Sequence, residues 1–599
     1  MSTVLAFLAF SASLMAQTGL VKEVKVTGNR LITEDAIRAR MATKVGQPFS
    51  QRTLDQDRDS IDIQGWFKAV DTRAELDQDG SYRVLVNVNE YAAVKEIRLT
   101  GVKEIDREDV LKVIREAIEP GLPFRRTRAK VISERISKLF EDRGFQAEVE
   151  SFDMLEESPE TLGVSLIVTT INKIELVGAT GTLRTRPAVL RRLIFSKAGE
   201  AYNINKFTED VIRLANTRWF EEPKVSATPV NGQPGKIDIA ISLKEARTGN
   251  FNFGAVLDPR NNIGGQLAVF DSNLFGTGQT VGINLQQVAV GGTSIDLNYG
   301  NPFVDNRLST INASVYSRVV FRFTGLFGAG GGNPTDAKQY FERRTGGSLS
   351  VTRPITKDLR QAITLGGRFE GIKTNNLDTV TTNDFIQQDG SLGVLQLGYT
   401  RNRRDLDLNP SRGDWLQLTY EPGVSDITRV GGQTNDPTFL GRGFFNRITF
   451  EYRTYWSPGQ KRRTIRDVES PRRTFAFRLR AGTVVGPKVP YFEQYFAGGV
   501  DSVRGYFQDR FWGKNLLTMN LEYRMPIQKS FNLIAFVDYG GAWGGYGTVG
   551  SFTQSKTFKM HVGFGPGVSF NSPFGPIRVD YGFTPEGKSQ LHFNLGTSF

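Results

Sequence analysis

From about Gly249 to the C-terminus, the chain alternates between apolar and polar residues with a period of two, in one segment after another. In the stretch LNY, for example, Leu297 and Tyr299 fall on one face of an extended strand and Asn298 falls on the other. Successive side chains of a β-strand point to opposite faces, so this period indicates strands with one apolar face. The last 351 residues are therefore expected to form a large β-sheet.

Two structures accommodate such strands: a soluble sandwich with an apolar core, or a membrane barrel with an apolar outer face. The connections are alternately tight and long, which is typical of outer-membrane barrels with short periplasmic turns and long extracellular loops. The tight connections include NLFGTGQ and MPIQKSF, and the long ones span 322–345, 371–390, 425–441, 486–514 and 540–556. Sixteen strands of about 9–11 residues fit this length, and closure of the sheet would hide its edges from lipid. We predict a 16-stranded antiparallel transmembrane β-barrel over residues 249–599.

A threefold repeat precedes this region. VKEVKVTGN, VKEIRLTGV and INKIELVGA are versions of one strand with glycines at Gly28, Gly101 and Gly178, which lie 73 and 77 residues apart. Each strand is followed by a helical segment, a turn with a glycine, a second helix that closes on an aromatic residue, and two alternating strands. The order β-α-α-β-β predicts three α+β modules in which helices cover one face of a sheet.

We place these modules at residues 20–91, 92–170 and 171–246. Units of this kind leave sheet edges open, and an open edge can pair with an extended peptide through backbone hydrogen bonds. The modules therefore either receive extended chains or serve only as spacers.

The N-terminal stretch MSTVLAFLAFSASLMAQ is apolar from Val4 to Met15 and ends in small residues. Its length is typical of the apolar region of a signal peptide and too short for a membrane-spanning helix. We expect a signal peptide over residues 1–16 with cleavage near Ala16, although the usual basic residues before the apolar part are missing.

Composition and motifs argue against an enzyme. The chain has no cysteine, and His561 and His592 are its only histidines, so we expect no disulfide, no metal site and no histidine-dependent triad. The glycines at 276–278 and 328–332 lack the strand–turn–helix context of a dinucleotide site, and no P-loop, HExxH or GxSxG motif is present. We therefore expect no catalytic residues and no cofactor.

The formal net charge of +12 would suit binding to nucleic acid or to an anionic membrane surface. Lys and Arg are spread along the whole chain, however, and no nucleic-acid-binding motif is present, so we expect no nucleic-acid partner. The one dense basic cluster lies within 459–473, where it is either a solvated loop or a site for anionic lipid headgroups.

A charged tetrad, Val503-Arg504-Gly505-Tyr506, stands alone in the long connection 486–514. The chain also contains the NLFGTGQ turn, NPF at 301–303, FVDYGGAW at 536–543 and LHFNLGTSF at its C-terminus. Together with the repeated modules and the sixteen-strand region, these motifs give essentially the whole mature chain a resemblance to the BamA/TamA family of outer-membrane assembly factors. The repeats resemble the POTRA domains of that family.

The resemblance implies that the sixth loop folds back into the barrel and that Arg504 pairs with acidic residues on the wall, which by motif are Glu522 and Asp538. Glu522 lies on the polar face of its strand, and a guanidinium in a confined lumen gains from carboxylate pairing. Gly505 would permit a tight turn or a close backbone approach, and Tyr506 would pack on the wall. The alternative is an exposed loop without partners.

The resemblance further implies a barrel in the outer membrane, POTRA domains in the periplasm, and insertion of other β-barrel proteins into that membrane. In this mechanism the first strand separates from the last, and the exposed edges template an incoming strand. The expected partners are unfolded barrel clients, outer-membrane lipid, and periplasmic or lipoprotein accessory subunits. The residues expected at the lateral seam are Phe251, Phe253, Asp258, Leu591, Phe593, Leu595, Gly596 and Phe599.

Two other functions are compatible with this organisation. One is a secretion transporter of the two-partner type, which exports a polypeptide through the lumen; such family members usually carry a plug helix before two POTRA domains. Here the first of three repeats begins almost directly after the expected signal peptide, which favours the insertase. A plain pore is the other alternative, but it would not need periplasmic modules.

Overall fold

The computed structural model describes residues 19–221, 223–257, 263–288, 292–323, 340–374, 386–432, 437–461, 470–528, 530–549, 552–572 and 575–595. By contacts, the chain divides into two compact units. The first comprises Met1–Glu175, Ser196–Phe207 and Ser226–Ile239, and the second comprises Leu176–Phe195, Thr208–Val225 and Ala240–Phe599. The expected signal peptide and residues 462–469 of the basic segment 459–473 lie outside the described residues.

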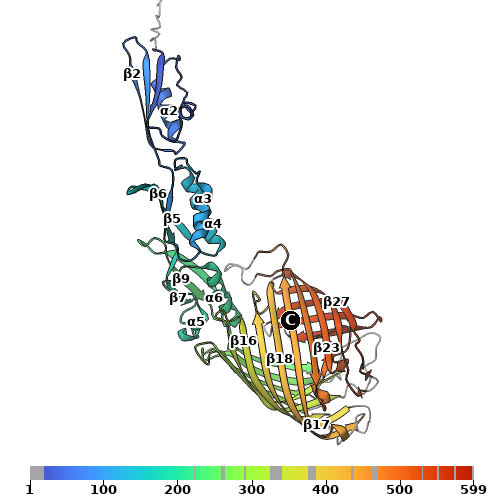
Figure 1. The fold of residues 1–599 in the computed structure, drawn as a ribbon. Helices are drawn as coiled ribbons and strands as arrows, with labels where there is room; N and C mark the ends of the chain where they lie inside the picture. The colour runs from blue at the N-terminus through green and yellow to red at the C-terminus, as the bar shows by residue number, and fades with distance from the viewer. Residues whose placement is uncertain are drawn as a thin grey trace, which may run out of the picture. The chain divides into compact units, whose positions relative to one another are not determined.

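Each of the three N-terminal modules has the predicted order β-α-α-β-β (Figure 1). The first contains β1 (Val21–Thr27), α1 (Glu34–Arg38), α2 (Gln51–Asp62), β2 (Phe67–Leu76) and β3 (Tyr82–Glu90). The second contains β4 (Glu96–Thr100), α3 (Arg107–Ala117), α4 (Arg128–Asp142), β5 (Ala147–Leu155) and β6 (Ser158–Val168). The third contains β7 (Thr170–Gly178), α5 (Pro187–Leu193), α6 (Ile204–Thr217), β8 (Lys224–Pro229) and β9 (Lys236–Leu243).

The three small sheets share one topology, with the last strand of each module in the centre: β1-β3-β2, β4-β6-β5 and β7-β9-β8. In the first module β1 runs parallel to β3, whereas β2 runs antiparallel to it. Parallel pairing requires a crossover connection, and the two helices supply it. The first and second strands of each module are therefore the sheet edges.

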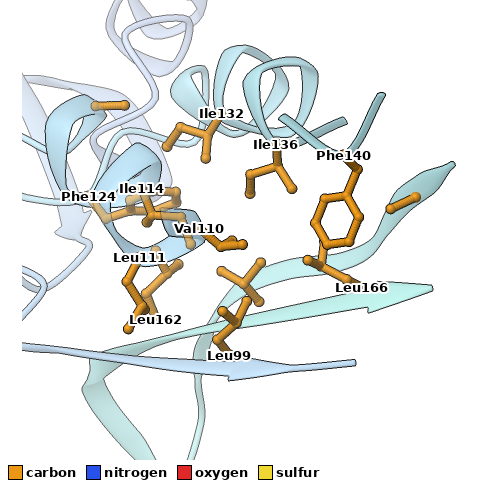
Figure 2. Packing of buried hydrophobic residues seen from close by; sticks show 13 residues of the cluster. Leu99, Val110, Leu111, Ile114, Phe124, Ile132, Ile136, Phe140, Leu162 and Leu166 are labelled. Atoms are coloured by element: carbon orange, nitrogen blue, oxygen red, sulfur yellow. The ribbon is translucent and has the colours of Figure 1, made fainter. Parts of the chain in front are cut away.

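The core of the second module shows how the sequence pattern builds such a unit (Figure 2). Ile132, Ile136 and Phe140 recur every fourth residue along α4 and form one apolar stripe on the helix. This stripe and the buried face of α3 cover the sheet, where Leu162 and Leu166 of β6 are buried. Cutting such a fully buried residue back to alanine would cost about 2–5 kcal/mol.

The rest of the chain forms a 16-stranded antiparallel sheet, as predicted (Figure 1). In order, its strands are β10 (Gly249–Leu257), β11 (Ile263–Leu274), β12 (Gln279–Val288), β13 (Gly292–Asn301), β14 (Thr310–Phe321), β15 (Phe341–Pro354), β16 (Gln361–Thr374), β17 (Ile386–Asn402), β18 (Gly413–Gly432), β19 (Gly441–Trp456), β20 (Thr474–Val485), β23 (Asn515–Gln528), β24 (Phe531–Trp543), β27 (His561–Ser572), β28 (Gly575–Phe583) and β29 (Ser589–Leu595). Each strand pairs with its neighbours in the chain, so the sheet is an up-and-down meander.

Burial in this sheet is reversed relative to a soluble protein. Leu521 and Val537 are 42% and 51% exposed, whereas Glu522 and Asp538 on the other face are 0% exposed. An apolar outer face and a polar interior are what a lipid-embedded barrel requires. No helix in the described part of the chain is long and apolar enough to cross a membrane.

Several strands are longer than the 9–11 residues expected from bilayer thickness. β17 and β18 contain 17 and 20 residues and extend into 371–390 and 425–441, which the sequence pattern had indicated as loops. The ladder between them continues to Ile386 and Gly432. Backbone pairing therefore does not stop where the apolar alternation stops.

Within the second unit, the segment before α5 is bonded to the first tight turn of the large sheet. Asn273 Nδ2 donates to Thr185 Oγ1 over 2.8 Å, and the backbone N–H of Arg186 donates to the carbonyl of Gly276 over 2.9 Å. The Glu245 carboxylate accepts a hydrogen bond of 2.7 Å from the backbone N–H of Thr185. The NLFGTGQ turn is therefore a docking point for the third module as well as a hairpin.

Candidate functional site

The connection between β20 and β23, residues 486–514, is named loop 6 here and carries the tetrad. It contains a short ribbon of β21 (Tyr495–Ala497) paired with β22 (Phe511–Gly513). Val503 and Arg504 are 0% and 1% exposed, so this charged motif is buried and not displayed on the surface. A buried guanidinium requires both counter-charge and hydrogen-bond acceptors.

Arg504 has three carboxylate partners. Its Nε and Nη2 each lie 2.7 Å from an oxygen of Asp538, in a bidentate arrangement. Its Nη1 lies 2.8 Å from Glu522 and 3.1 Å from Asp580. The backbone N–H of Arg504 donates to Asp538 over 3.0 Å, and the guanidinium lies 3.6 Å from the centre of the Phe536 ring. The structure thus brings together the three residues Arg504, Glu522 and Asp538 that the resemblance had implied.

Two further arginines balance the charge of this cluster. Arg578 lies 2.7 Å from both Glu522 and Asp580, and Arg524 lies 2.9 Å from Glu522. Together with Arg504 these are three cations facing the three carboxylates of Glu522, Asp538 and Asp580. A charge-balanced network of this kind holds a fixed geometry, because loss of any member leaves a buried charge uncompensated.

The strands position these groups by alternation and register. Asn520 and Glu522 share the inner face of β23, and Asn520 is the ladder partner of Asp538 on β24. Asn520 Nδ2 donates to Asp538 over 2.8 Å and fixes the carboxylate for Arg504. Room for the loop comes from β27, where a Cβ on Gly563 would lie 1.8 Å from the carbonyl oxygen of Arg504.

Gly505 lies against the last two strands of the sheet. Its φ of +95° favours glycine, and a Cβ on Gly582 of β28 would lie 2.3 Å from its nitrogen. Its backbone N–H donates to Nε2 of His592 on β29 over 2.9 Å. The expected close backbone approach at this position therefore occurs, and it occurs at an edge strand.

Tyr506 completes the tetrad at the end of the barrel that carries the long loops. Its hydroxyl donates to Glu586 over 2.9 Å, and its ring meets those of His561 and Phe511 edge-on at 5.4 Å and 5.1 Å. Tyr506 therefore packs against the β27 wall and is tied to the connection between β28 and β29.

The residues expected at the seam lie on the two edge strands, as far as they are described. Phe251 and Phe253 on β10 and Phe593 on β29 are exposed on the outer face. β10 pairs with β11 and β29 pairs with β28, and no ladder joins β10 to β29 among the described residues. Leu591 also lies on β29. Asp258, Gly596 and Phe599 lie outside the described residues, as does the side chain of Leu595.

Sequence reasoning missed several members of the site. Asp580 and Arg578 had a usable signal, since both lie on the polar face of a recognised strand. His592 was considered only as a metal ligand or catalytic base, whereas it serves as a hydrogen-bond acceptor. Sequence reasoning also did not identify Glu493, a buried acidic residue of loop 6. Within the described residues, no group of three or more histidines or acidic residues could hold a metal ion.

The fold and the site together define an outer-membrane β-barrel protein with POTRA modules and a loop anchored inside the barrel. The Omp85 superfamily domain matches residues 273–599, and the surface antigen variable number repeat of POTRA type matches residues 20–91 and 169–246. The chain belongs to the Omp85 superfamily, and accordingly its barrel lies in the outer membrane and its POTRA domains lie in the periplasm.

Relatives are similar along nearly the whole chain. The outer membrane protein assembly factor BamA of Neisseria meningitidis serogroup B is 21% identical, with 97% of this chain and 78% of that protein covered. The chloroplastic outer envelope protein 80 of Arabidopsis thaliana is 23% identical, with 94% and 74% covered. The solved structure of CdiB from Escherichia coli has a TM-score of 0.50 at 13% identity, covering 84% of this chain and 89% of that one. The likeness to CdiB concerns the fold.

Proposed function

We propose that this protein assembles β-barrel proteins and inserts them into the outer membrane through a lateral seam between β10 and β29. The observation that carries the proposal is the pair of edge strands: each is paired on one side, and no ladder joins them within the described residues. An unpaired strand edge is a template for another strand. A relative similar over nearly the whole chain is named an outer membrane protein assembly factor, which supports the same function.

The POTRA modules would receive the clients. Each has a sheet whose first and second strands are edges, so an extended segment could add to it by backbone pairing without a specific sequence. No catalytic group is needed for this step, because insertion into the bilayer is driven by burial of the apolar outer face and by completion of the backbone hydrogen bonds.

The tetrad would hold loop 6 against the strands that end at the seam. Arg504 contacts β28 through Asp580, and Gly505 contacts β29 through His592. The clients are proposed only as a class, folding intermediates of barrel proteins. The accessory subunits are likewise proposed only as periplasmic or lipoprotein partners.

A disulfide trap tests the seam. Since the chain has no cysteine, one cysteine can be placed within 251–257 and another within 589–595, and the oxidised variant expressed as the only copy. The proposal expects several different outer-membrane barrels to decline and to recover on reduction. A control disulfide at Phe251 and Val269, ladder partners on β10 and β11, closes a pair that need not open and should leave assembly unchanged.

The same experiment distinguishes the second candidate, a secretion transporter of the two-partner type. The fold is shared with CdiB, and fold alone does not decide function. Normal accumulation of barrel proteins in the locked variant, with loss of one secreted protein when the lumen is blocked, would favour export and exclude insertion through the seam.

A further inference from the structure

Loop 6 carries a second buried charge, Glu493, eleven residues before Arg504. It ends the short 3-10 helix η3 (Tyr491–Glu493) and is 1% exposed. A carboxylate removed from water to this extent is stable as an anion only if cations and hydrogen-bond donors surround it.

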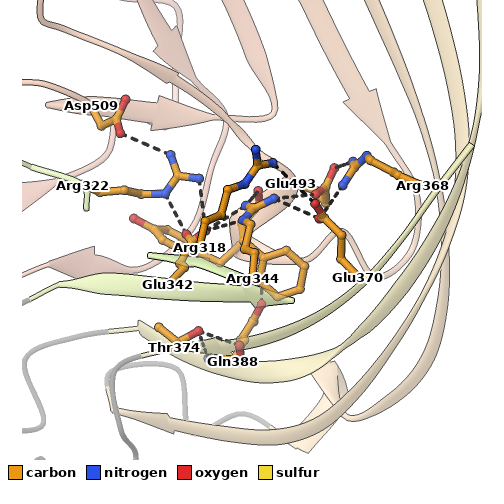
Figure 3. Close-up of polar contacts among 12 residues, drawn as sticks. Arg318, Arg322, Glu342, Arg344, Arg368, Glu370, Thr374, Gln388, Glu493 and Asp509 are labelled. Atoms are coloured by element: carbon orange, nitrogen blue, oxygen red, sulfur yellow. Dashed lines mark hydrogen bonds and ion pairs between the residues drawn. The ribbon is translucent and has the colours of Figure 1, made fainter. Parts of the chain in front are cut away.

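Three arginines of the wall surround this carboxylate. Glu493 lies 2.7 Å from Arg368 of β16, 3.5 Å from Arg447 of β19 and 3.7 Å from Arg344 of β15. Arg344 also donates to the backbone carbonyl of Phe492 over 3.0 Å. Figure 3 shows Arg344 and Arg368 directed toward Glu493.

The wall supplies its own carboxylates to the same arginines. Arg344 and Arg368 lie 3.3 Å and 2.8 Å from Glu370, and Arg344 lies 2.8 Å from Glu342 (Figure 3). Glu493 therefore completes a network that the wall has partly built. Without it, the cations of this network would outnumber the carboxylates that bind them.

Neutral contacts hold the same part of the loop on the same wall. The Tyr495 hydroxyl lies 2.7 Å from both the carbonyl of Ile448 and Oγ1 of Thr449. The backbone N–H of Tyr491 donates to Oε1 of Gln388 over 2.8 Å. Glu493 thus lies in the middle of the segment 491–495, which is bonded to β17 at Tyr491 and to β19 at Tyr495.

Glu493 and Arg504 have partners that extend to opposite parts of the sheet, although Arg447 on β19 and Glu522 on β23 are only two strand positions apart. Arg368 lies on β16, which is seventh in the strand order, and Asp580 lies on β28, which is fifteenth. The two strands are eight positions apart, half of the sixteen. The anchors also have opposite polarity, since a loop carboxylate meets wall arginines at one and a loop arginine meets wall carboxylates at the other.

We propose that Glu493 is a second, independent anchor of loop 6, a positioning residue that fixes the first half of the loop to β15, β16 and β19. Loop 6 is then a brace between two sides of the lumen: the Glu493 network holds residues 491–495 and reaches Asp509 through Arg322, and a second network holds Arg504. Releasing Glu493 frees the segment around 494 and leaves the tetrad in place. The inference rests on these contacts and does not depend on the function proposed above.

Single cysteines report on each half of the loop, because the full-length chain has none of its own. Gln494→Cys probes the Glu493 anchor and Val503→Cys probes the tetrad; the two side chains are 2% and 0% exposed. The rate of labelling by a water-soluble maleimide measures how often each site opens. With Glu493→Gln we expect labelling at 494 to accelerate about tenfold while labelling at 503 stays unchanged, and with Arg504→Met we expect the reverse.

Asp501→Asn is the matched control, because it removes a carboxylate from the same loop at an exposed position and should leave both rates unchanged. Arg368→Gln removes the wall partner of Glu493 and should accelerate labelling at 494 as Glu493→Gln does. It therefore tests the anchor even if the Glu493→Gln variant fails to fold. Labelling at 494 no faster than in the Asp501→Asn control, in both Glu493→Gln and Arg368→Gln, would overturn the proposal. Equal acceleration at 494 and 503 would show a single cooperative loop and would also overturn it.

Discussion

His592, on the last strand of the sheet, accepts a 2.9 Å hydrogen bond from the backbone N–H of Gly505 in loop 6. The tetrad is therefore bonded directly to the edge strand β29, so a movement of β29 would break this hydrogen bond to the tetrad. An acceptor nitrogen must be unprotonated, so His592 is neutral in this arrangement.

Replacing His592 tests this link. His592→Ala leaves the buried Gly505 N–H without its acceptor, which should cost about 1–3 kcal/mol of unfolding free energy. His592→Gln retains an acceptor oxygen and should lose less. Denaturant unfolding of the detergent-solubilised barrel measures both, and equal stability of the alanine variant and the wild type would contradict the role assigned to this bond.

Arg504→Met should lower the unfolding free energy by about 3–5 kcal/mol, because three buried carboxylates lose the counter-ion that they share. Arg504→Lys should recover only part of this loss, since an ammonium cannot make the bidentate contact with Asp538. The double variant Arg504→Met/Asp538→Asn should lose less unfolding free energy than the sum of the losses in the two single variants. In Arg504→Met the Asp538 carboxylate has already lost its arginine, so removing its charge costs less. Arg307, exposed in a periplasmic turn, offers the control: Arg307→Met should change stability by less than about 0.5 kcal/mol.

The sequence was sufficient to predict the sixteen strands, and the family resemblance added three members of the tetrad site, Arg504, Glu522 and Asp538. A period of two reports directly on which side chains face the lumen, so Glu522, Arg578 and Asp580 could be placed on the polar face of their strands. Only the family resemblance connected Arg504 with Glu522 and Asp538, because loop 6 and the wall are joined by no local pattern.

The Glu493 anchor could not be predicted in this way. Its partners lie on β15, β16 and β19, more than forty residues away along the chain, and they converge only after the ladder registers have set the shape of the wall. A weaker signal was present nevertheless: Glu493 is flanked by aromatic residues in PYFEQYF, and a carboxylate in an apolar run is rarely buried without a cation. The extension of β17 and β18 beyond the apolar band also follows from register, which the alternation does not report.

The third module contains a residue in a conformation that glycine occupies in the other two. Gly65 and Gly144 follow the second helix of their modules with φ of +76° and +85°, and Arg218 takes the equivalent position with φ of +57°. Arg218→Gly should therefore stabilise the protein by up to about 1 kcal/mol, since relief of the left-handed penalty exceeds the added entropy of the unfolded chain. Arg218→Ala keeps a Cβ and should give no gain. If both variants unfold at the same denaturant concentration, the strain assigned to Arg218 is absent.

Glu245 holds the segment before α5 through Thr185, which is itself bonded to Asn273 in the first turn of the sheet, and protonation of Glu245 should weaken its hold on that segment. Burial alone would raise its pKa, but hydrogen bonds from the backbone N–H groups of Arg184 and Thr185 and from the Thr185 hydroxyl outweigh burial, so the pKa falls below the ordinary 4.5. A carboxyl whose pKa is lower in the folded state contributes stability that is complete above its unfolded pKa and is lost as pH falls through the folded pKa. We therefore expect this contribution to be constant from pH 7 to about 5 and to decline at lower pH.

The glutamine variant separates this effect from general acid unfolding. Glu245→Gln cannot ionise, and at pH 7 it should cost about 1–3 kcal/mol through weaker hydrogen bonds to the two backbone N–H groups. The difference in unfolding free energy between wild type and variant should shrink as pH is lowered below 4.5, because the wild-type carboxylate then becomes protonated. Glu221→Gln is the control: Glu221 pairs with Lys244 at an exposed position, so the change should cost less than about 1 kcal/mol. If the difference in unfolding free energy between wild type and Glu245→Gln stays constant from pH 7 to pH 3, the charge of Glu245 contributes nothing to stability.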